Sequence, residues 1–237
     1  MTHYKQRDPG VGSYNDYLGL VENAREEGMD VTFDCYTYPY SGTTITILLP
    51  DWSKDGGPET LMNHLKSPIS RKKMCKEINH NAFKENWLTN FKNKHNKIYE
   101  GLSVSEIALF QDKETCETIF DLLIDENLGI STVGLGNTPH SIPEFVKHPA
   151  GMLASDSLIF GDYPNPRTYG NFTKVIGEFS RDDKLLPIED AIRKMTSFPA
   201  QRLGLGKKGL LVDGYDCLLY TSDAADEGLG VDLGGRR

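Results

Sequence analysis

The order of elements around residue 30 is the feature that most restricts the fold. Residues 14–28 keep the helical spacing of apolar side chains, and Gly28 suits the C-terminal end of a helix. The run MDVTFDCYTYPY (residues 29–40) is rich in β-branched and aromatic residues up to Pro39, which predicts a buried strand followed by a loop. A helix that leads into a buried strand without a turn-rich hairpin is typical of α/β proteins.

Further elements are predicted from periodicity and breakers, and the middle of the chain differs in composition. Residues 50 to about 130 are rich in Lys and Asn and hold both tryptophans. Strands are expected at 128–136 and 150–156, and another strand is expected to begin in the segment 209–216. Helices are expected at about 58–65, 69–80, 103–111, 114–126 and 143–149, and a further helix begins at Pro187, has an apolar stripe from Ile188 to Met195 and is closed by Gly204 and Gly206.

The composition is that of a folded globular chain and argues against several functions. The 237 residues are 38% hydrophobic and 25% charged, with a net charge of −8. A pI near 5.3 and the absence of a basic run argue against nucleic-acid and anionic-membrane partners. The sequence contains no apolar run of about 18 residues and no recognisable signal peptide, so no membrane partner is expected.

The cysteines bear on the compartment. Cys35, Cys75, Cys116 and Cys217 are widely spaced and form no CxxC pair. This pattern argues against a zinc ribbon or a disulfide scaffold and favours a reducing compartment. We therefore expect a cytoplasmic location for this chain.

One charged residue ends the apolar run GMLASD, and another follows eleven positions later. Asp156 would lie at the carboxyl end of a buried strand, where α/β barrels place catalytic groups, although Asp is also a common N-cap. Arg167, in NPRTYG, suits bidentate capture of a carboxylate, and an ordinary surface arginine is the alternative.

Two further candidates open the chain. His3 and Lys5 alternate as neighbours on one face of a strand, so an imidazole for zinc and an ammonium for an anion would point the same way. The alternative is an unstructured N-terminus. The run DCYTYPYSGTT (residues 34–44) is expected to form either one side of a substrate-binding site or an ordinary packed loop. The remaining histidines show no HxH or HExxH spacing, and GLGN is too short a motif to indicate a dinucleotide.

The last 21 residues differ from the rest of the chain. Residues 217–237 contain CLLYTSDAADE followed by VDLGGRR, which resemble, in order, one translated frame of a transposase-type sequencing adapter. We expect the native sequence to end near Asp216 and Met1 to be the first available start in a gene fragment. A natural disordered tail is the alternative. Without the tail the net charge changes from −8 to −6, which leaves the conclusions on partners unchanged.

Most of residues 1–216 resembles the C-terminal half of the N-acyl-D-amino-acid deacylases (D-aminoacylases), in the amidohydrolase superfamily. The most specific signature is an S-D pair, then PR-x-YG-x-F, then A-x-RKMTS-x-PA-x-RLGL. The resemblance implies an α/β fold, namely part of a metal-dependent TIM-like (β/α) barrel with the remnant of a small β domain. Residues about 50–140 match an α-rich insertion before the last barrel strand.

The resemblance also implies roles for individual residues. His3 corresponds to a zinc ligand, and Asp156 to the general base beside the metal. Lys5, Tyr38 and Arg167 correspond to positions that bind the substrate carboxylate, although the irregular CYTYPY run allows a shift from Tyr38 to Tyr36. The implied reaction is zinc-dependent hydrolysis of an N-acyl-D-amino acid.

Several family features have no counterpart here. The HxH pair, a cysteine ligand and another histidine would precede Met1, and Asn165 replaces the histidine of an HPR motif. Because catalytic zinc needs about three protein ligands, we expect the fragment alone to be inactive. An open parallel-sheet edge also predicts poor solubility. Alternatives for the parent protein are a non-catalytic amidohydrolase-fold protein, or an enzyme acting on another linear or cyclic amide.

Overall fold

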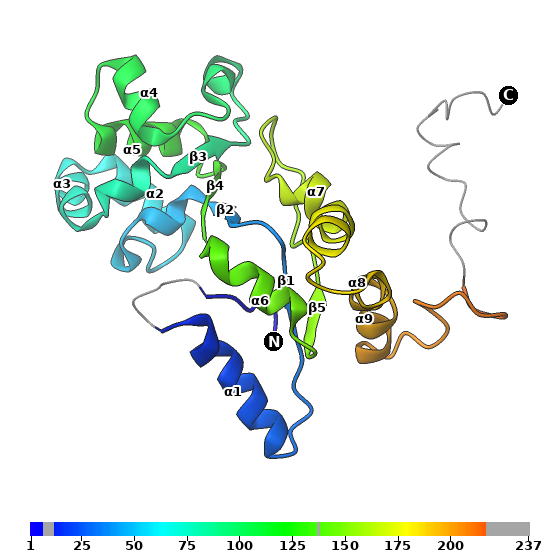
Figure 1. Ribbon diagram of the computed structural model, residues 1–237. Coiled ribbons are helices and arrows are strands. Elements are labelled where there is room, and N and C mark those ends of the chain that lie inside the picture. The colour runs from blue at the N-terminus through cyan, green and yellow to red at the C-terminus, as the bar shows by residue number, and fades with distance from the viewer. Residues whose placement is uncertain (7–11, 137, 217–237) are drawn as a thin grey trace, which may run out of the picture.

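The computed structural model describes residues 1–6, 12–136 and 138–216, and shows a mixed α/β chain in two parts (Figure 1). The adapter-like segment 217–237 lies outside the described residues. We call residues 40–135 the helix-rich part, and residues 1–6, 12–39 and 138–216 the parallel-sheet part. No helix within these ranges is long and apolar enough to cross a bilayer.

The parallel-sheet part is built on two short strands, each preceded by a helix. Helix α1 (Tyr14–Glu26) precedes β1 (Phe33–Cys35), and α6 (Ile142–Lys147) precedes β5 (Gly151–Leu153). The two strands pair in parallel, with Phe33 opposite Gly151. The first residues of the chain lie along the other side of β1. There the Asp34 amide donates to the Met1 carbonyl at 3.1 Å, and the Tyr4 amide to the Asp34 carbonyl at 2.8 Å.

Helices after β5 complete this part. Helix α7 (Arg167–Lys174) continues as a π-helix (Val175–Asp182), followed by α8 (Ile188–Met195) and α9 (Ser197–Arg202). Pro187 ends the preceding loop, and acidic residues fill the first turn of α8, where they favour the helix dipole. The core gathers side chains from both strands and from α1, α6 and α8: Leu18, Val21, Phe33, Cys35, Ile142, Phe145, Val146, Ala150, Leu153, Val175, Phe179, Leu186 and Ala191.

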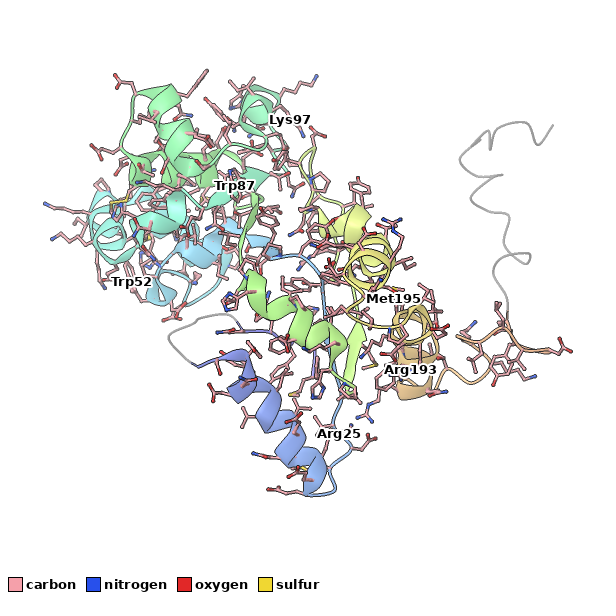
Figure 2. All side chains as sticks on the ribbon, in the orientation of Figure 1. Arg25, Trp52, Trp87, Lys97, Arg193 and Met195 are labelled. Carbon is pink, nitrogen blue, oxygen red and sulfur yellow. A yellow bond between two sulfur atoms is a disulfide. The ribbon has the colours of Figure 1, made fainter. Side chains whose placement is uncertain are left out.

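The helix-rich part has its own sheet and core. Its antiparallel sheet has the order β2–β4–β3, from Tyr40–Thr44, Ser131–Leu135 and Asn86–Thr89. The helices α2 (Pro58–Lys66) and α3 (Pro68–Glu77) both begin at a proline, which is favoured at the first helical position. Helices α4 (Val104–Gln111) and α5 (Thr115–Asp125) follow, and 3₁₀ turns span Ile45–Leu48, Asp51–Ser53, His80–Phe83 and Lys94–Tyr99. Both tryptophans lie in this part (Figure 2).

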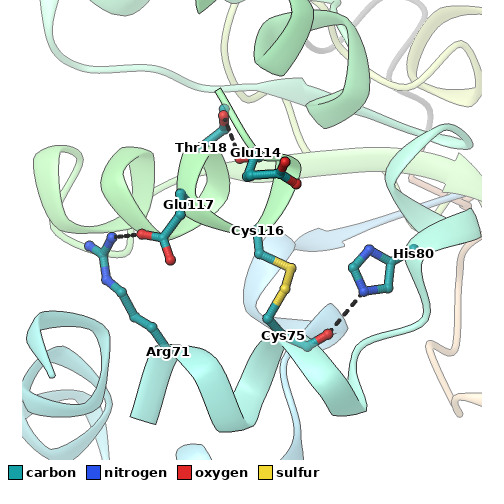
Figure 3. Close-up of a disulfide and its surroundings, with 7 residues drawn as sticks. All are labelled: Arg71, Cys75, His80, Glu114, Cys116, Glu117 and Thr118. Atoms are coloured by element: carbon teal, nitrogen blue, oxygen red, sulfur yellow. Dashed lines mark hydrogen bonds and ion pairs between the residues drawn. A yellow bond between two sulfur atoms is a disulfide. The ribbon is translucent and has the colours of Figure 1, made fainter. Parts of the chain in front are cut away.

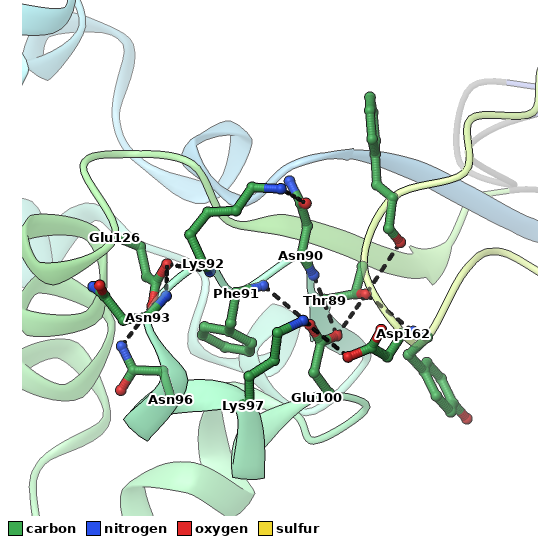
Figure 4. Close-up of polar contacts among 12 residues, drawn as sticks. Thr89, Asn90, Phe91, Lys92, Asn93, Asn96, Lys97, Glu100, Glu126 and Asp162 are labelled. Atoms are coloured by element: carbon green, nitrogen blue, oxygen red, sulfur yellow. Dashed lines mark hydrogen bonds and ion pairs between the residues drawn. The ribbon is translucent and has the colours of Figure 1, made fainter.

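Two carboxylates organise the loop after β3 (Figure 4). Glu100 accepts hydrogen bonds from the Thr89 hydroxyl at 2.7 Å and from the amides of residues 90 and 91. Glu126, which is buried, accepts the amides of residues 92 and 93 and the side chain of Asn96. Lys97 joins this loop to Asp162 of the other part at 2.9 Å. The loop is thereby held against the segment that follows β5.

The structure confirms most predicted elements and corrects others. The helices expected at about 58–65, 69–80, 103–111 and 114–126 all form, with ends shifted by a few residues. The strand expected in the segment 209–216 does not form, because no described strand lies beside this segment to supply hydrogen bonds. The argument against a disulfide was wrong for one pair: Cys75 and Cys116 are bonded, since the packing of α3 on α5 brings their Cα atoms to 5.7 Å.

Candidate functional site

Three segments bring polar side chains to the carboxyl end of the parallel strands. His3 lies in the segment beside β1, Tyr36 directly follows β1, and Asp156 comes three residues after β5. Since the strands are parallel, these ends meet at one edge of the sheet, which is where α/β folds place functional groups. The predicted positions of His3 and Asp156 therefore converge.

His3 and Asp156 form a pair. The His3 Nε2 atom lies 3.3 Å from Asp156 Oδ1, and the two side chains are 38% and 31% exposed. The His3 amide also donates to Asp34 Oδ1 at 2.9 Å. Both His3 and Asp156 have positive φ angles, 50° and 46°, which non-glycine residues rarely adopt. Such backbone strain costs about 1–3 kcal/mol and clusters at functional sites.

Arg167 is buried rather than on the surface. Its side chain is 3% exposed, and its Nη2 atom donates to Asp156 Oδ2 at 2.7 Å. The backbone amide of Arg167 donates to Asn165 Oδ1 at 3.1 Å, so the residue in place of the HPR histidine fixes the start of α7. The Nε atom of Arg167 is buried with no hydrogen-bond partner among the described residues. The guanidinium thus keeps one buried donor without a partner among the described residues, which costs free energy.

Tyr36 links the two cations. Lys5 Nζ donates hydrogen bonds to the Tyr36 hydroxyl and, at 2.9 Å, to Ser41 Oγ. The Arg167 guanidinium lies 4.1 Å from the centre of the Tyr36 ring. Burial raises the pKa of Tyr36, but the hydrogen bonds from Lys5 and Ser41 and the nearby positive charges outweigh burial, so the pKa is lowered. Lys5, Tyr36 and Arg167 therefore form a compact positively charged group beside Asp156.

Tyr38 occupies a different place from Tyr36. Its hydroxyl packs so closely on Gly170 that a Cβ there would lie 2.2 Å from it, and Lys174 Nζ lies 4.9 Å from its ring centre. Tyr38 thus packs on α7. Of the two tyrosines considered from the sequence, Tyr36 is the one that contacts Lys5 and Arg167.

Asn171 on α7 fixes the loops that carry the site. Its Oδ1 accepts the Thr37 amide at 2.9 Å, and its Nδ2 donates to the Ala154 carbonyl at 3.0 Å. One buried side chain therefore holds both the residue after Tyr36 and the segment before Asp156. Sequence reasoning missed Asn171 and Ser41, although both lie within the motifs YG-x-F and YPYSGTT that it had already marked.

A pocket of about 240 Å³ adjoins Asp156 and Arg167. Its other walls come from β2 and β4, from the end of β3, and from the loop after β5. The lining is hydroxyl-bearing or apolar apart from Asn165 and the two site residues: Gly42, Thr43, Thr44, Thr89, Ser131, Thr132, Val133, Leu158, Phe160 and Pro164. The cavity therefore lies between the two parts of the chain, next to the charged groups.

Comparison with known proteins points to one family. No protein-family model matches the chain. An N-acyl-D-aspartate deacylase of Alcaligenes xylosoxydans xylosoxydans is 42% identical over 79 residues, which are 33% of this chain and 16% of that protein. An N-acyl-D-glutamate deacylase of the same organism is 26% identical over 226 residues, which are 94% of this chain and 39% of that protein.

Solved structures agree on the fold. A zinc-bound N-acyl-D-glutamate deacylase from Bordetella bronchiseptica superposes with a TM-score of 0.65 at 23% identity, over 91% of this chain and 38% of the other. A D-aminoacylase described as defining a novel subset of amidohydrolases gives 0.62 over 90% of this chain and 37% of the other. The chain is similar in sequence to N-acyl-D-amino-acid deacylases and shares the fold of their solved structures. It spans well under half the length of these deacylases.

Proposed function

We propose that the complete protein hydrolyses the amide bond of N-acyl-D-amino acids, giving a D-amino acid and a carboxylate. The observation that carries this proposal is the group of Lys5, Tyr36 and Arg167 beside the His3–Asp156 pair. Three donors for one carboxylate suit a substrate with a free carboxylate near its scissile amide. A cyclic amide without that carboxylate would leave these donors unused.

Zinc is the metal that we propose for the site, and the residues present suit part of its ligand set. An imidazole nitrogen and a carboxylate oxygen lie 3.3 Å apart at the strand ends, and both atom types are zinc ligands. A catalytic zinc site uses about three protein ligands, so groups beyond these two would have to complete it. When bound, zinc would polarise the amide carbonyl and acidify water.

The residues of this chain would then share the remaining tasks. Asp156 would accept the proton of the attacking water and later return a proton to the leaving amine. Arg167 now pairs with Asp156 at 2.7 Å, and a substrate carboxylate would share its guanidinium. Lys5 and the Tyr36 hydroxyl would hold the same carboxylate from the other side. With the carboxylate and the carbonyl both fixed, the configuration at Cα determines which substituent faces the 240 Å³ pocket.

The remaining architecture is part of the same proposal. We propose that residues 1–216 are the C-terminal part of a TIM-like barrel, with the helix-rich part as its insertion at about 50–140. The parallel order of residues 1–4, β1 and β5 supports an arc of such a barrel. Small N-acyl amino acids, not nucleic acids or membranes, are the expected partners. A cytoplasmic location also stays a proposal, against which the disulfide is the main observation.

Hydrolysis by the complete protein tests the proposed function. The zinc-loaded enzyme is offered the N-acetyl derivatives of D- and L-amino acids in parallel, and release of the free amino acid is measured. We expect turnover of D-substrates at least about 100-fold faster than of their enantiomers. Equal turnover of both enantiomers, or none of either, would contradict the proposal.

A further inference from the structure

A group of side chains of the kinds that bind metals lies around the disulfide of the helix-rich part (Figure 3). Cys75 on α3, Cys116 on α5 and His80 each place one ligand atom within 4.8 Å of the others. Cys75 is half-buried, Cys116 is buried and His80 is exposed, so the group lies at the surface but not in open solvent. Two sulfurs and one imidazole are the ligand types that zinc prefers.

Local contacts orient the His80 ring. Its Nε2 atom lies 2.9 Å from the Cys75 carbonyl oxygen, which accepts only, so Nε2 carries the proton. In the neutral ring this leaves the Nδ1 lone pair free to bind a metal. Metal-binding histidines commonly donate their second ring nitrogen to a backbone carbonyl in this way. The ring also packs edge-on against the buried Phe83, with centroids 5.7 Å apart.

The surroundings favour thiolates once the disulfide is open. The sulfurs line an open pocket in which Lys66, Lys72, Lys76 and Arg71 outnumber Glu114 and Glu117, and a net positive charge stabilises thiolates against thiols. Arg71, in the same pocket, is already paired with Glu117 and with Asp121. Two thiolates would neutralise a divalent ion, and the open pocket admits a water as the fourth ligand. With zinc–sulfur bonds of about 2.3 Å, a tetrahedral site needs the sulfurs only about 3.8 Å apart.

We propose that Cys75, Cys116 and His80 form a zinc site when their disulfide is reduced. A dithiol reductant gives two electrons and two protons to the disulfide, yielding two cysteine thiols and the oxidised cyclic disulfide of the reductant. Zinc then binds the two sulfurs and the neutral imidazole and displaces two thiol protons. Cys75 and Cys116 thus hold α3 against α5 by a covalent bond under oxidising conditions and, together with His80, by a metal ion under reducing ones. This site does not depend on the proposed deacylase activity.

Cobalt(II) binding by the full chain tests the site, because thiolate ligation gives cobalt a charge-transfer absorption band. Every protein in the test carries Cys217→Ser, so that the tail thiol does not contribute. The reduced chain is freed from reductant without oxygen and titrated, and zinc competition gives the zinc affinity. His80→Ala removes the imidazole. His95→Ala is the matched control, because His95 is an exposed histidine of the same part that pairs with Asp125.

We expect one cobalt per reduced chain with the thiolate band and no such band in the oxidised chain. His80→Ala should weaken zinc binding at least about tenfold, Cys116→Ser should abolish the band, and His95→Ala should change nothing. Zinc should also protect Cys75 and Cys116 from alkylation, whereas the buried Cys35 should react at the same rate with and without zinc. A reduced chain without the band overturns the proposal, whether or not it keeps its helical circular dichroism. Unchanged affinity in His80→Ala overturns it as well.

Discussion

The two parts of the chain differ in how their cores are stabilised. The helix-rich part closes its own core, in which Leu65, Met74, Ile107 and Phe120 are essentially inaccessible, and it adds a disulfide across α3 and α5. The parallel-sheet part buries Phe33 and Val175 as completely, but it rests on two strands of three residues each and has no disulfide among its described residues. Parallel sheets are normally covered on both faces.

This difference shows that the candidate active site belongs to the part with the smaller sheet and no covalent cross-link among its described residues. The helix-rich part supplies walls of its pocket. The contacts of Thr89 with the Phe160 carbonyl and of Lys97 with Asp162 join the two. The helix-rich part therefore serves as a rigid support for the loop that follows Asp156.

The largest expected effect of a single substitution lies in the helix-rich core. Phe120 is fully buried on α5, so Phe120→Ala should lower the free energy of unfolding of this part by about 3–5 kcal/mol. Leu109→Ala is the control, because Leu109 is 83% exposed and should cost less than about 0.5 kcal/mol. Tryptophan fluorescence during denaturant unfolding measures the free energy of unfolding of this part, because it holds both tryptophans. Equal effects of the two substitutions would show that this core is not closed.

The parallel-sheet part also has a fully buried large side chain, but this one is charged. Lys194 on α8 is fully buried, and its Nζ donates to the carbonyls of His148 at 2.6 Å and Gly151 at 3.0 Å. Lys194→Met keeps the bulk but removes the donor to the Gly151 carbonyl and leaves the His148 carbonyl with only the Gly151 amide, which should cost about 2 kcal/mol. Thermal unfolding measures the loss, and Lys207→Met, at an exposed site, is the matched control. An unchanged unfolding temperature in Lys194→Met would mean that water reaches these carbonyls.

A smaller effect is expected from the carboxylate that organises the loop after β3. Glu126→Gln keeps the shape but turns an amide NH₂ toward backbone donors of residues 92 and 93, at a cost of about 1–2 kcal/mol. Hydrogen exchange of those two amides should accelerate, whereas Glu85→Gln, at an exposed site, should leave them unchanged. Unaltered exchange in Glu126→Gln would show that the loop holds its shape without this charge.

The smallest predicted effect is a pH dependence from His148. Burial lowers the pKa of His148, although Glu22 opposes that shift. The unfolded chain therefore binds this proton more readily, so stability should fall as the pH drops from about 6.5 through the lowered folded pKa. Unfolding midpoints between pH 7.5 and pH 5 should change less in His148→Gln than in the wild type. An identical slope in both proteins would assign the pH dependence to other groups.

The sequence predicted what local rules determine. The helices expected in the middle of the chain were found close to their expected ends, because the signals that begin them are local: the structure shows a proline at the start of α2 and of α3, and a capping box at Ser103 before α4. Cys75 and Cys116 are 41 positions apart, and only the packing of α3 on α5 reveals their bond. The choice between Tyr36 and Tyr38 depends on where β1 ends, which the aromatic run CYTYPY does not specify.

The role of Arg167 is the central claim, and comparing a substrate with its neutral analogue tests it most directly. The complete enzyme and its Arg167→Gln variant are each assayed with an N-acetyl-D-amino acid and with the corresponding carboxamide. If Arg167 binds the carboxylate, the wild type should prefer the acid by at least about 100-fold in kcat/KM, and the variant should lose most of that preference. A variant that slows both substrates equally would show that Arg167 only positions Asp156, and would contradict the proposed carboxylate site.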